Sequence, residues 1–159
     1  MNATGDAPRL IISDIDGTFI TSAGRVTDRL RRVIVRAVES GAHFGLATGR
    51  PHRWLIPVLE QLPIAPVCVC ANGAVVYDPA SDRVLHAYEL ARAAMAEVVE
   101  VAERVLAGVP HGYGVERVGS SALDPEEECF IVTPEYNRDA WDSQFGVTDT
   151  QTLISQPAA

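Results

Sequence analysis

Three short apolar runs, each followed by a polar motif, constrain the fold of this chain more than any other feature. The runs occupy residues 10–12, 43–47 and 67–71. A short apolar run that ends in polar residues, as the first one does, is typical of a strand buried on both faces of a sheet. Segments with helical signals separate the three runs. The order strand, helix, strand, helix, strand predicts an α/β fold with a parallel sheet and right-handed crossovers.

The two helical segments have recognisable starts and stops. Thr27 is placed to cap the first helix, and Gly41 is placed to end it. Pro51 suits the first turn of a second helix, which extends to about Gln61. Both helices connect successive strands, as a parallel sheet requires.

The second half of the chain has a different character. A hairpin is predicted around residues 79–82, and a strong amphipathic helix over residues 91–106. Two strand candidates follow at residues 114–118 and 129–133, on either side of an acidic loop at residues 124–128. We therefore expect residues 1–89 to form one domain and residues 90–159 to form part of a second, α+β domain.

The string Asp14-Ile15-Asp16-Gly17-Thr18 follows the first predicted strand, at the sheet edge where open α/β folds bind ligands. Residues two apart on an extended chain point to the same side, so Asp14 and Asp16 can share one site while Ile15 turns into the core. Two close carboxylates favour a divalent cation or a shared proton. A shuffled chain contains such a string in roughly 0.3% of cases. The alternative is a polar turn whose aspartates only cap a loop.

This string resembles the first motif of the haloacid dehalogenase superfamily of phosphohydrolases. Residues 47–50 and 72–74, after the second and third strands, are similar to motifs of its Cof-like branch, which contains sugar-phosphate and cofactor phosphatases. Three motifs in order, at three successive strand ends, are more specific together than any one alone. The resemblance implies an incomplete Rossmann-like core for residues 1–89 and an incomplete α+β cap domain for residues 90–159.

The resemblance also implies roles for the motif residues in phosphate monoester hydrolysis. Asp14 would attack phosphorus and form an aspartyl phosphate, while Asp16 would protonate the leaving alkoxide and then activate water. Mg²⁺ at Asp14 and Asp16 would screen the repulsion between carboxylate and phosphate dianion. The expected phosphate-binding residues are Thr48, Gly49, Arg50, Asn72 and Gly73.

Several residues of the second and third motifs also have a plainer interpretation. Thr48 could serve solely as the N-cap of the helix that begins at Pro51, with no contact to phosphate. Arg50 could hold substrate, bind a carboxylate of the cap domain, or form a surface ion pair. Asn72 and Gly73 could serve solely to form a turn beside the site, with no contact to substrate.

The later motifs of the superfamily are not recognisable in the chain. They comprise a basic residue, usually Lys, and an acidic group on core segments after the cap. All 13 basic residues are arginines, and the last acidic residue is Asp149. We therefore expect a fragment that carries the first half of a Cof-like phosphatase, with a weak metal site, an unpaired sheet edge and little or no activity alone. A noncatalytic phosphate-binding or interaction module and a mutase-like phosphotransferase are the alternatives.

The composition limits the classes of molecule that the chain is expected to bind. The formal net charge of −8 disfavours a chain that coats nucleic acid. No apolar stretch suits a membrane span and no leader-like segment opens the chain, so a cytoplasmic location is expected. The expected partner is a small phosphorylated metabolite, and nothing fixes the oligomeric state. Cys68 and Cys70 are expected to be buried structural thiols rather than zinc ligands.

Overall fold

The computed structural model describes residues 8–123, 129–136 and 146–159. The chain divides into two compact units, Met1–His86 and Ala87–Ala159. The acidic loop expected at residues 124–128 lies outside the described residues. Within the described ranges, no helix is long and apolar enough to cross a membrane.

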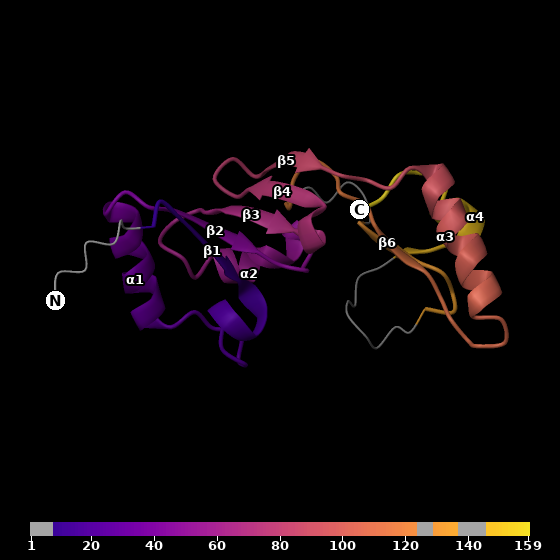
Figure 1. Cartoon of the computed structure of the whole chain (residues 1–159), viewed down its shortest axis with the longest axis horizontal. Helices are drawn as coiled ribbons and strands as arrows, with labels where there is room; N and C mark the ends of the chain where they lie inside the picture. Colours follow the sequence, from indigo (N-terminus) through magenta and orange to yellow (C-terminus); the bar gives the residue numbers. More distant parts are fainter. Residues whose placement is uncertain (1–7, 124–128, 137–145) are drawn as a thin grey trace. The chain divides into compact units, whose positions relative to one another are not determined.

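The first unit is built on a five-stranded sheet with the strand order β1-β2-β3-β4-β5 (Figure 1). β1, β2 and β3 are parallel, which confirms the predicted parallel α/β core, and β4 runs antiparallel to β3. β4 and β5 are neighbours in the sheet on either side of residues 79–82, where the hairpin is predicted. The strands are β1 (Leu10–Asp14), β2 (His43–Ala47), β3 (Val67–Cys70), β4 (Val75–Asp78) and β5 (Arg83–Ala87).

The first helix, α1 (Asp28–Glu39), has the ends that the sequence predicts. The Thr27 hydroxyl oxygen accepts a hydrogen bond from the Leu30 backbone N–H at 3.2 Å, which satisfies one of the unpaired donors of the first turn. Gly41 has a φ of +94°, a backbone conformation that favours glycine and ends the helix.

The second helix is shorter than predicted and broken into two parts. A 3₁₀ turn, η2 (His52–Leu55), is followed by one turn of α-helix, α2 (Ile56–Leu59). Pro57 has no N–H to donate to the carbonyl four residues earlier, and its ring would clash with that carbonyl. A continuous, regular α-helix from Pro51 to Gln61 is therefore disfavoured by about 3 kcal/mol.

β1 is an edge strand, so the prediction that it is buried on both faces is wrong. Among the described strands it pairs only with β2, which leaves the expected unpaired edge. Leu10 and Ile12, two apart on one face, remain 60% and 50% exposed. Burial on both faces requires a layer over each face of a sheet, and here this face of β1 stays half open. The core lies deeper, around Ile15, Leu46 and Leu55.

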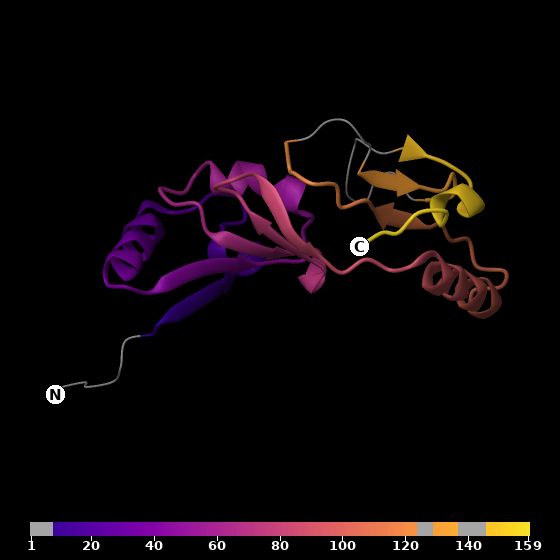
Figure 2. The ribbon, with the colours of Figure 1, turned by 90° about the horizontal axis from the view of Figure 1, so that it is seen from above.

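In its described residues, the second unit has two helices and a small sheet of order β6-β7-β8. α3 confirms the predicted amphipathic helix, and it lies beside the small sheet (Figure 2). β6 and β7 confirm the two strand candidates with shorter bounds, whereas β8 and α4 were not predicted. The elements are α3 (Arg92–Val105), β6 (Gly114–Glu116), β7 (Phe130–Val132), β8 (Gly146–Val147) and α4 (Thr150–Leu153).

The thiols of the first unit are buried as expected. Cys68 and Cys70 are both fully inaccessible on β3. Burial disfavours the thiolate and raises the pKa of each to about 12. Both side chains therefore act as small apolar groups in the core.

Candidate active site

The three motifs lie at the carboxyl ends of β1, β2 and β3, which are adjacent and parallel. Asp14 ends β1 directly opposite Ala47 of β2, and Ala47 in turn lies opposite Val69 of β3. Because parallel strands end at the same edge of a sheet, the segments that follow them gather there. The motifs are thus neighbours in space although they are more than twenty residues apart in the sequence.

The segment after β1 turns sharply within a few residues. Asp14 and Asp16 keep extended backbone angles and stay exposed, while Ile15 is fully buried, as the alternation predicts. Gly17 has a φ of +73°, which a residue with a side chain rarely adopts. The five-residue helical turn η1 (Ile15–Phe19) closes with a hydrogen bond from the Ile20 N–H to the Ile15 carbonyl at 3.1 Å.

The segment after β2 is fixed by backbone hydrogen bonds to the segment after β3. The Thr48 N–H donates to the Val69 carbonyl at 2.9 Å, and the Thr48 carbonyl accepts from Asn72 at 3.2 Å. The Arg50 carbonyl accepts from the Ala71 N–H at 2.9 Å. These bonds fix the backbone positions from which the side chains of Thr48 and Arg50 extend.

Thr48 is buried, and its hydroxyl oxygen accepts a hydrogen bond from the Arg50 N–H at 3.1 Å. The turn η2, which begins after Pro51, has no side-chain cap. Thr48 therefore holds its own motif in place rather than capping the helix. Its hydroxyl hydrogen can still be donated to another acceptor.

Residues 71–73 form a turn with three successive positive φ angles. Ala71, Asn72 and Gly73 have φ values of 49°, 54° and 103°. Only glycine adopts such angles without cost, so the alanine stores strain of the kind that collects at functional sites. A Cβ on Gly49 would lie 3.0 Å from the Asn72 side-chain oxygen, so a glycine at position 49 lets the two segments approach closely.

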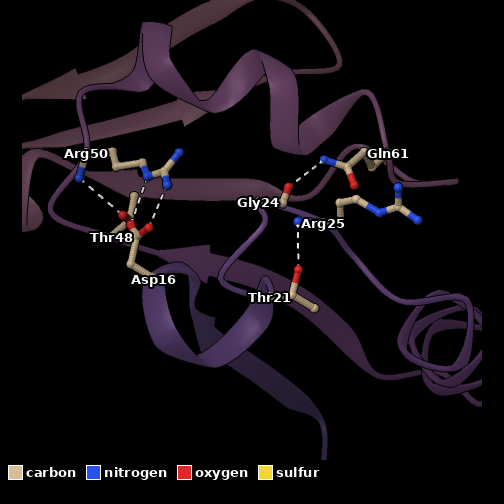
Figure 3. A network of polar contacts seen from close by, with 7 residues as sticks. All are labelled: Asp16, Thr21, Gly24, Arg25, Thr48, Arg50 and Gln61. Carbon is tan, nitrogen blue, oxygen red and sulfur yellow. Dashed lines mark hydrogen bonds and ion pairs between the residues drawn. The ribbon is translucent and has the colours of Figure 1, made fainter. Parts of the chain in front are cut away.

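An ion pair joins the first motif to the second. The Arg50 guanidinium donates from Nε to Asp16 Oδ2 at 2.8 Å and from Nη2 to Asp16 Oδ1 at 2.5 Å. Figure 3 shows this two-pronged contact with Thr48 beside it. Two parallel charge-assisted bonds are the strongest arrangement available to such a pair. Of the three interpretations of Arg50, this contact is an ion pair at the surface, and its partner belongs to the same unit.

This ion pair changes the chemistry of Asp16. The hydrogen bonds from Arg50 hold the pKa of the Asp16 carboxyl below its usual range, and the same contact raises the pKa of Arg50. Asp16 is therefore an ionised acceptor in this arrangement. Protonation of Asp16 weakens its attraction to the guanidinium, so the ion pair opposes proton uptake by this carboxylate.

The donor set suits Mg²⁺ only in part. Mg²⁺ is usually held by one or two carboxylates together with phosphate oxygens and water. The exposed Asp14 carboxylate and the Asp16 backbone carbonyl are donors of this kind. Within the part of the chain that the structure describes, no three His, Cys, Asp or Glu side chains gather into a metal cluster.

The structure links most of the predicted site residues, but not all of them. Hydrogen bonds and an ion pair connect Asp16, Thr48, Arg50 and Asn72. Gly49 lies between Thr48 and Arg50, and a side chain there would crowd Asn72. Asp14 is placed beside them by strand register alone, and Gly73 completes the turn. Ala71 is a member that the sequence analysis missed, because an alanine in a left-handed turn has no sequence signal.

Comparison with known proteins defines the class to which this fold and site belong. The model of the haloacid dehalogenase-like hydrolase family matches residues 11–111. The match covers more than half of the chain, so the chain belongs to this family, as its motifs predict.

Particular relatives resemble parts of the chain. Pyridoxal phosphate phosphatase YbhA of Escherichia coli is 32% identical over 79 residues, which are 50% of this chain and 29% of that protein. The 5-amino-6-(5-phospho-D-ribitylamino)uracil phosphatase YitU of Bacillus subtilis is 31% identical over 75 residues, which are 47% of this chain and 28% of that protein.

A solved structure extends the likeness to both units. The phosphatase BT1666 of Bacteroides thetaiotaomicron, from the haloalkanoate superfamily, matches with a TM-score of 0.69 at 16% identity. The match covers 97% of this chain and 54% of that one. At this identity the likeness concerns the fold alone. The chain thus spans about half of that structure, and its matched segments span under a third of the two relatives above.

Proposed function

We propose that this chain carries the nucleophile and part of the phosphate-binding site of a phosphatase that hydrolyses a small phosphate monoester. One observation carries the proposal: the Asp14-x-Asp16 pair at the end of β1 is joined by Arg50 to the strained, hydrogen-bonded turns after β2 and β3. Such preorganised groups at one sheet edge suit a charged ligand that is gripped from several sides.

Asp14 is the nucleophile in this proposal. It lies on the strand itself, so its backbone is fixed by the ladder to β2, and its exposure leaves it open to a ligand. Attack on phosphorus forms an aspartyl phosphate and releases the alkoxide, and water then hydrolyses this intermediate. Dividing one displacement into two steps lets the same surrounding groups stabilise both.

Asp16 acts as the general acid and base, and the second motif binds the phosphoryl group. Asp16 takes a proton from solvent before the first step, gives it to the leaving alkoxide, and afterwards takes one from the attacking water. The Thr48 hydroxyl donates to a phosphoryl oxygen, and Gly49, which has no side chain, permits close approach of the backbone. Asn72 and Gly73 border the same place.

Mg²⁺ is the proposed cofactor, held by the Asp14 carboxylate and the Asp16 carbonyl. When bound, it supplies positive charge that offsets the repulsion between a carboxylate and a phosphate dianion. The small number of protein donors implies weak binding by these residues alone. The relatives that act on a phosphorylated vitamin and on a ribityl phosphate support a small phosphorylated metabolite as substrate.

The test is hydrolysis of p-nitrophenyl phosphate by the natural full-length polypeptide that contains residues 1–159. We expect activity that requires Mg²⁺, and a loss of about a thousandfold or more in Asp14→Asn, because the amide cannot attack phosphorus. Arg29→Gln, an exposed change on α1, is the matched control and should act like the wild type. Full activity of Asp14→Asn would disprove the assignment of the nucleophile.

A second candidate is a noncatalytic module that binds phosphate. The ion pair that occupies Asp16 favours it, because an occupied carboxylate performs no proton transfer. This candidate predicts saturable binding of inorganic phosphate with no hydrolysis of any phosphate monoester. The same preparation distinguishes the two functions.

A further inference from the structure

The starting point is a conflict between the proposed role of Asp16 and its contacts. Both carboxylate oxygens accept hydrogen bonds from Arg50, at 2.8 and 2.5 Å. A carboxylate held in this way has one lone pair of each oxygen engaged by the guanidinium, which fixes its orientation and favours its ionised form. Proton transfer requires one of these oxygens to face the reacting atoms within hydrogen-bond distance. The pair in the structure is therefore a resting arrangement.

The Arg50 side chain can leave Asp16 without disturbing the turns around it. The Arg50 backbone is fixed by two bonds of its own, from its N–H to Thr48 Oγ1 and from the Ala71 N–H to its carbonyl. Those bonds do not involve the guanidinium. Neither partner of the ion pair is deeply buried, since the side chains of Arg50 and Asp16 are 30% and 55% exposed. Reorientation of the arginine thus breaks only the ion pair.

A phosphoryl group is the competitor that the geometry favours. A guanidinium carries five N–H groups in a planar fork that matches phosphate as well as it matches carboxylate. A phosphate dianion carries twice the charge of one carboxylate, so it attracts the guanidinium more strongly at the same distance. The Thr48 hydroxyl and the turns at residues 49 and 72 lie next to this arginine and would hold the phosphate there.

We propose that Arg50 is a latch on Asp16 that the phosphoryl group of the substrate opens. Without phosphate, Arg50 holds the Asp16 carboxylate. With phosphate, Arg50 binds a phosphoryl oxygen and Asp16 is released toward the leaving group. Arg50 thereby makes the availability of Asp16 depend on an occupied site, which is a coupling between two contacts of one side chain. This inference rests on the proposed function, since it requires phosphate to bind at this edge.

A double-mutant cycle on phosphate binding tests the latch. Binding of inorganic phosphate is measured by calorimetry, at constant pH, Mg²⁺ and ionic strength, for wild type, Asp16→Asn, Arg50→Gln and the double variant. If Asp16 competes for Arg50, Asp16→Asn strengthens binding by at least about fivefold while Arg50 is present. In the Arg50→Gln background the same substitution has almost no effect, because the competition no longer exists.

The cycle separates the latch from simple charge repulsion. Removing the Asp16 charge also lessens repulsion of phosphate, but that gain does not need Arg50. An equal gain in both backgrounds would therefore overturn the latch and leave the proposed function intact. No phosphate binding by wild type and Asp16→Asn alike would contradict both. Arg29→Gln is the matched control and should bind phosphate as the wild type does, and circular dichroism establishes that each variant is folded.

Discussion

Arg50 in the first unit and Arg117 in the second both donate through the guanidinium, but to different kinds of acceptor. Arg50 is partly exposed and pairs with a carboxylate. Arg117 is 8% exposed and donates to three backbone carbonyls, those of Leu153, Gln156 and Pro157, each at 2.6 Å. An exposed ion pair can exchange partners, whereas a buried guanidinium bound to backbone carbonyls is held by acceptors whose positions the fold sets.

The difference reflects how each unit is held together. The first unit has a sheet of five strands, and backbone hydrogen bonds order the turns that follow them. The fold there does not depend on the guanidinium of Arg50. The second unit has strands of three, three and two residues. Its described ladders are short, and a long side chain completes the hydrogen bonding of the segment after α4. The same residue type thus joins two segments of the candidate site in one unit and holds backbone segments together in the other.

The largest expected contrast between the units is in thiol reactivity. Cys68 and Cys70 are buried with a pKa of about 12, whereas Cys129 of the second unit is only half buried. Because the thiolate is the reactive form, the two buried thiols should react with a disulfide reagent at pH of about 8 more slowly by orders of magnitude. Labelling of the native protein should show one fast-reacting thiol, and unfolding in urea should make the other two react as fast. Three equally fast thiols would contradict the burial of β3.

Replacing Arg117 tests whether it is structural. Arg117→Met leaves three carbonyls without their donor, so we expect the second unit to lose about 2–4 kcal/mol of unfolding free energy. Hydrogen exchange resolved by segment should speed up at residues 114–116 and 150–153 and stay unchanged at residues 43–47. Arg92→Met, an exposed change on α3, should do neither. Unchanged exchange in Arg117→Met would show that water replaces the guanidinium as the hydrogen-bond donor to these carbonyls.

A smaller effect is expected at the cap of α1. Thr27→Ala removes the hydrogen bond to the Leu30 N–H and should cost the first unit about 1 kcal/mol, measured by urea unfolding. Ser22→Ala, an exposed change before the helix, is the control. A loss of stability in the second unit would mean that the two units unfold together.

The smallest effect concerns the pH dependence of the second unit. The Val109 carbonyl and the Glu103 carboxylate hold the pKa of His111 above its ordinary value of 6.5, with Tyr113 and Glu135 also nearby. Its contribution to stability is therefore complete below pH 6.5 and is lost as the pH rises through the folded-state value. His111→Gln should remove a small difference in urea midpoint between pH values of about 6 and 8. If the difference in urea midpoint persists in His111→Gln, it arises from another titratable group.

The sequence predicted the elements of the first unit better than those of the second. Thr27 and Gly41 mark the ends of α1 because capping needs only residues within one turn. Pro57 breaks the second helix by an equally local effect, which the prediction from Pro51 did not take into account. β8 has only two residues, and so short a segment has no periodicity from which to predict it.

The sequence by itself determined the family, the order of the strands along the chain, and the residue types at three strand ends. These depend on short motifs and local periodicity. Only the tertiary structure decided that Arg50 pairs with Asp16, 34 residues away, and that β1 lies at an open edge. Both depend on which strands become neighbours and what covers them, and no local pattern encodes that because the contacts form only after the chain has folded.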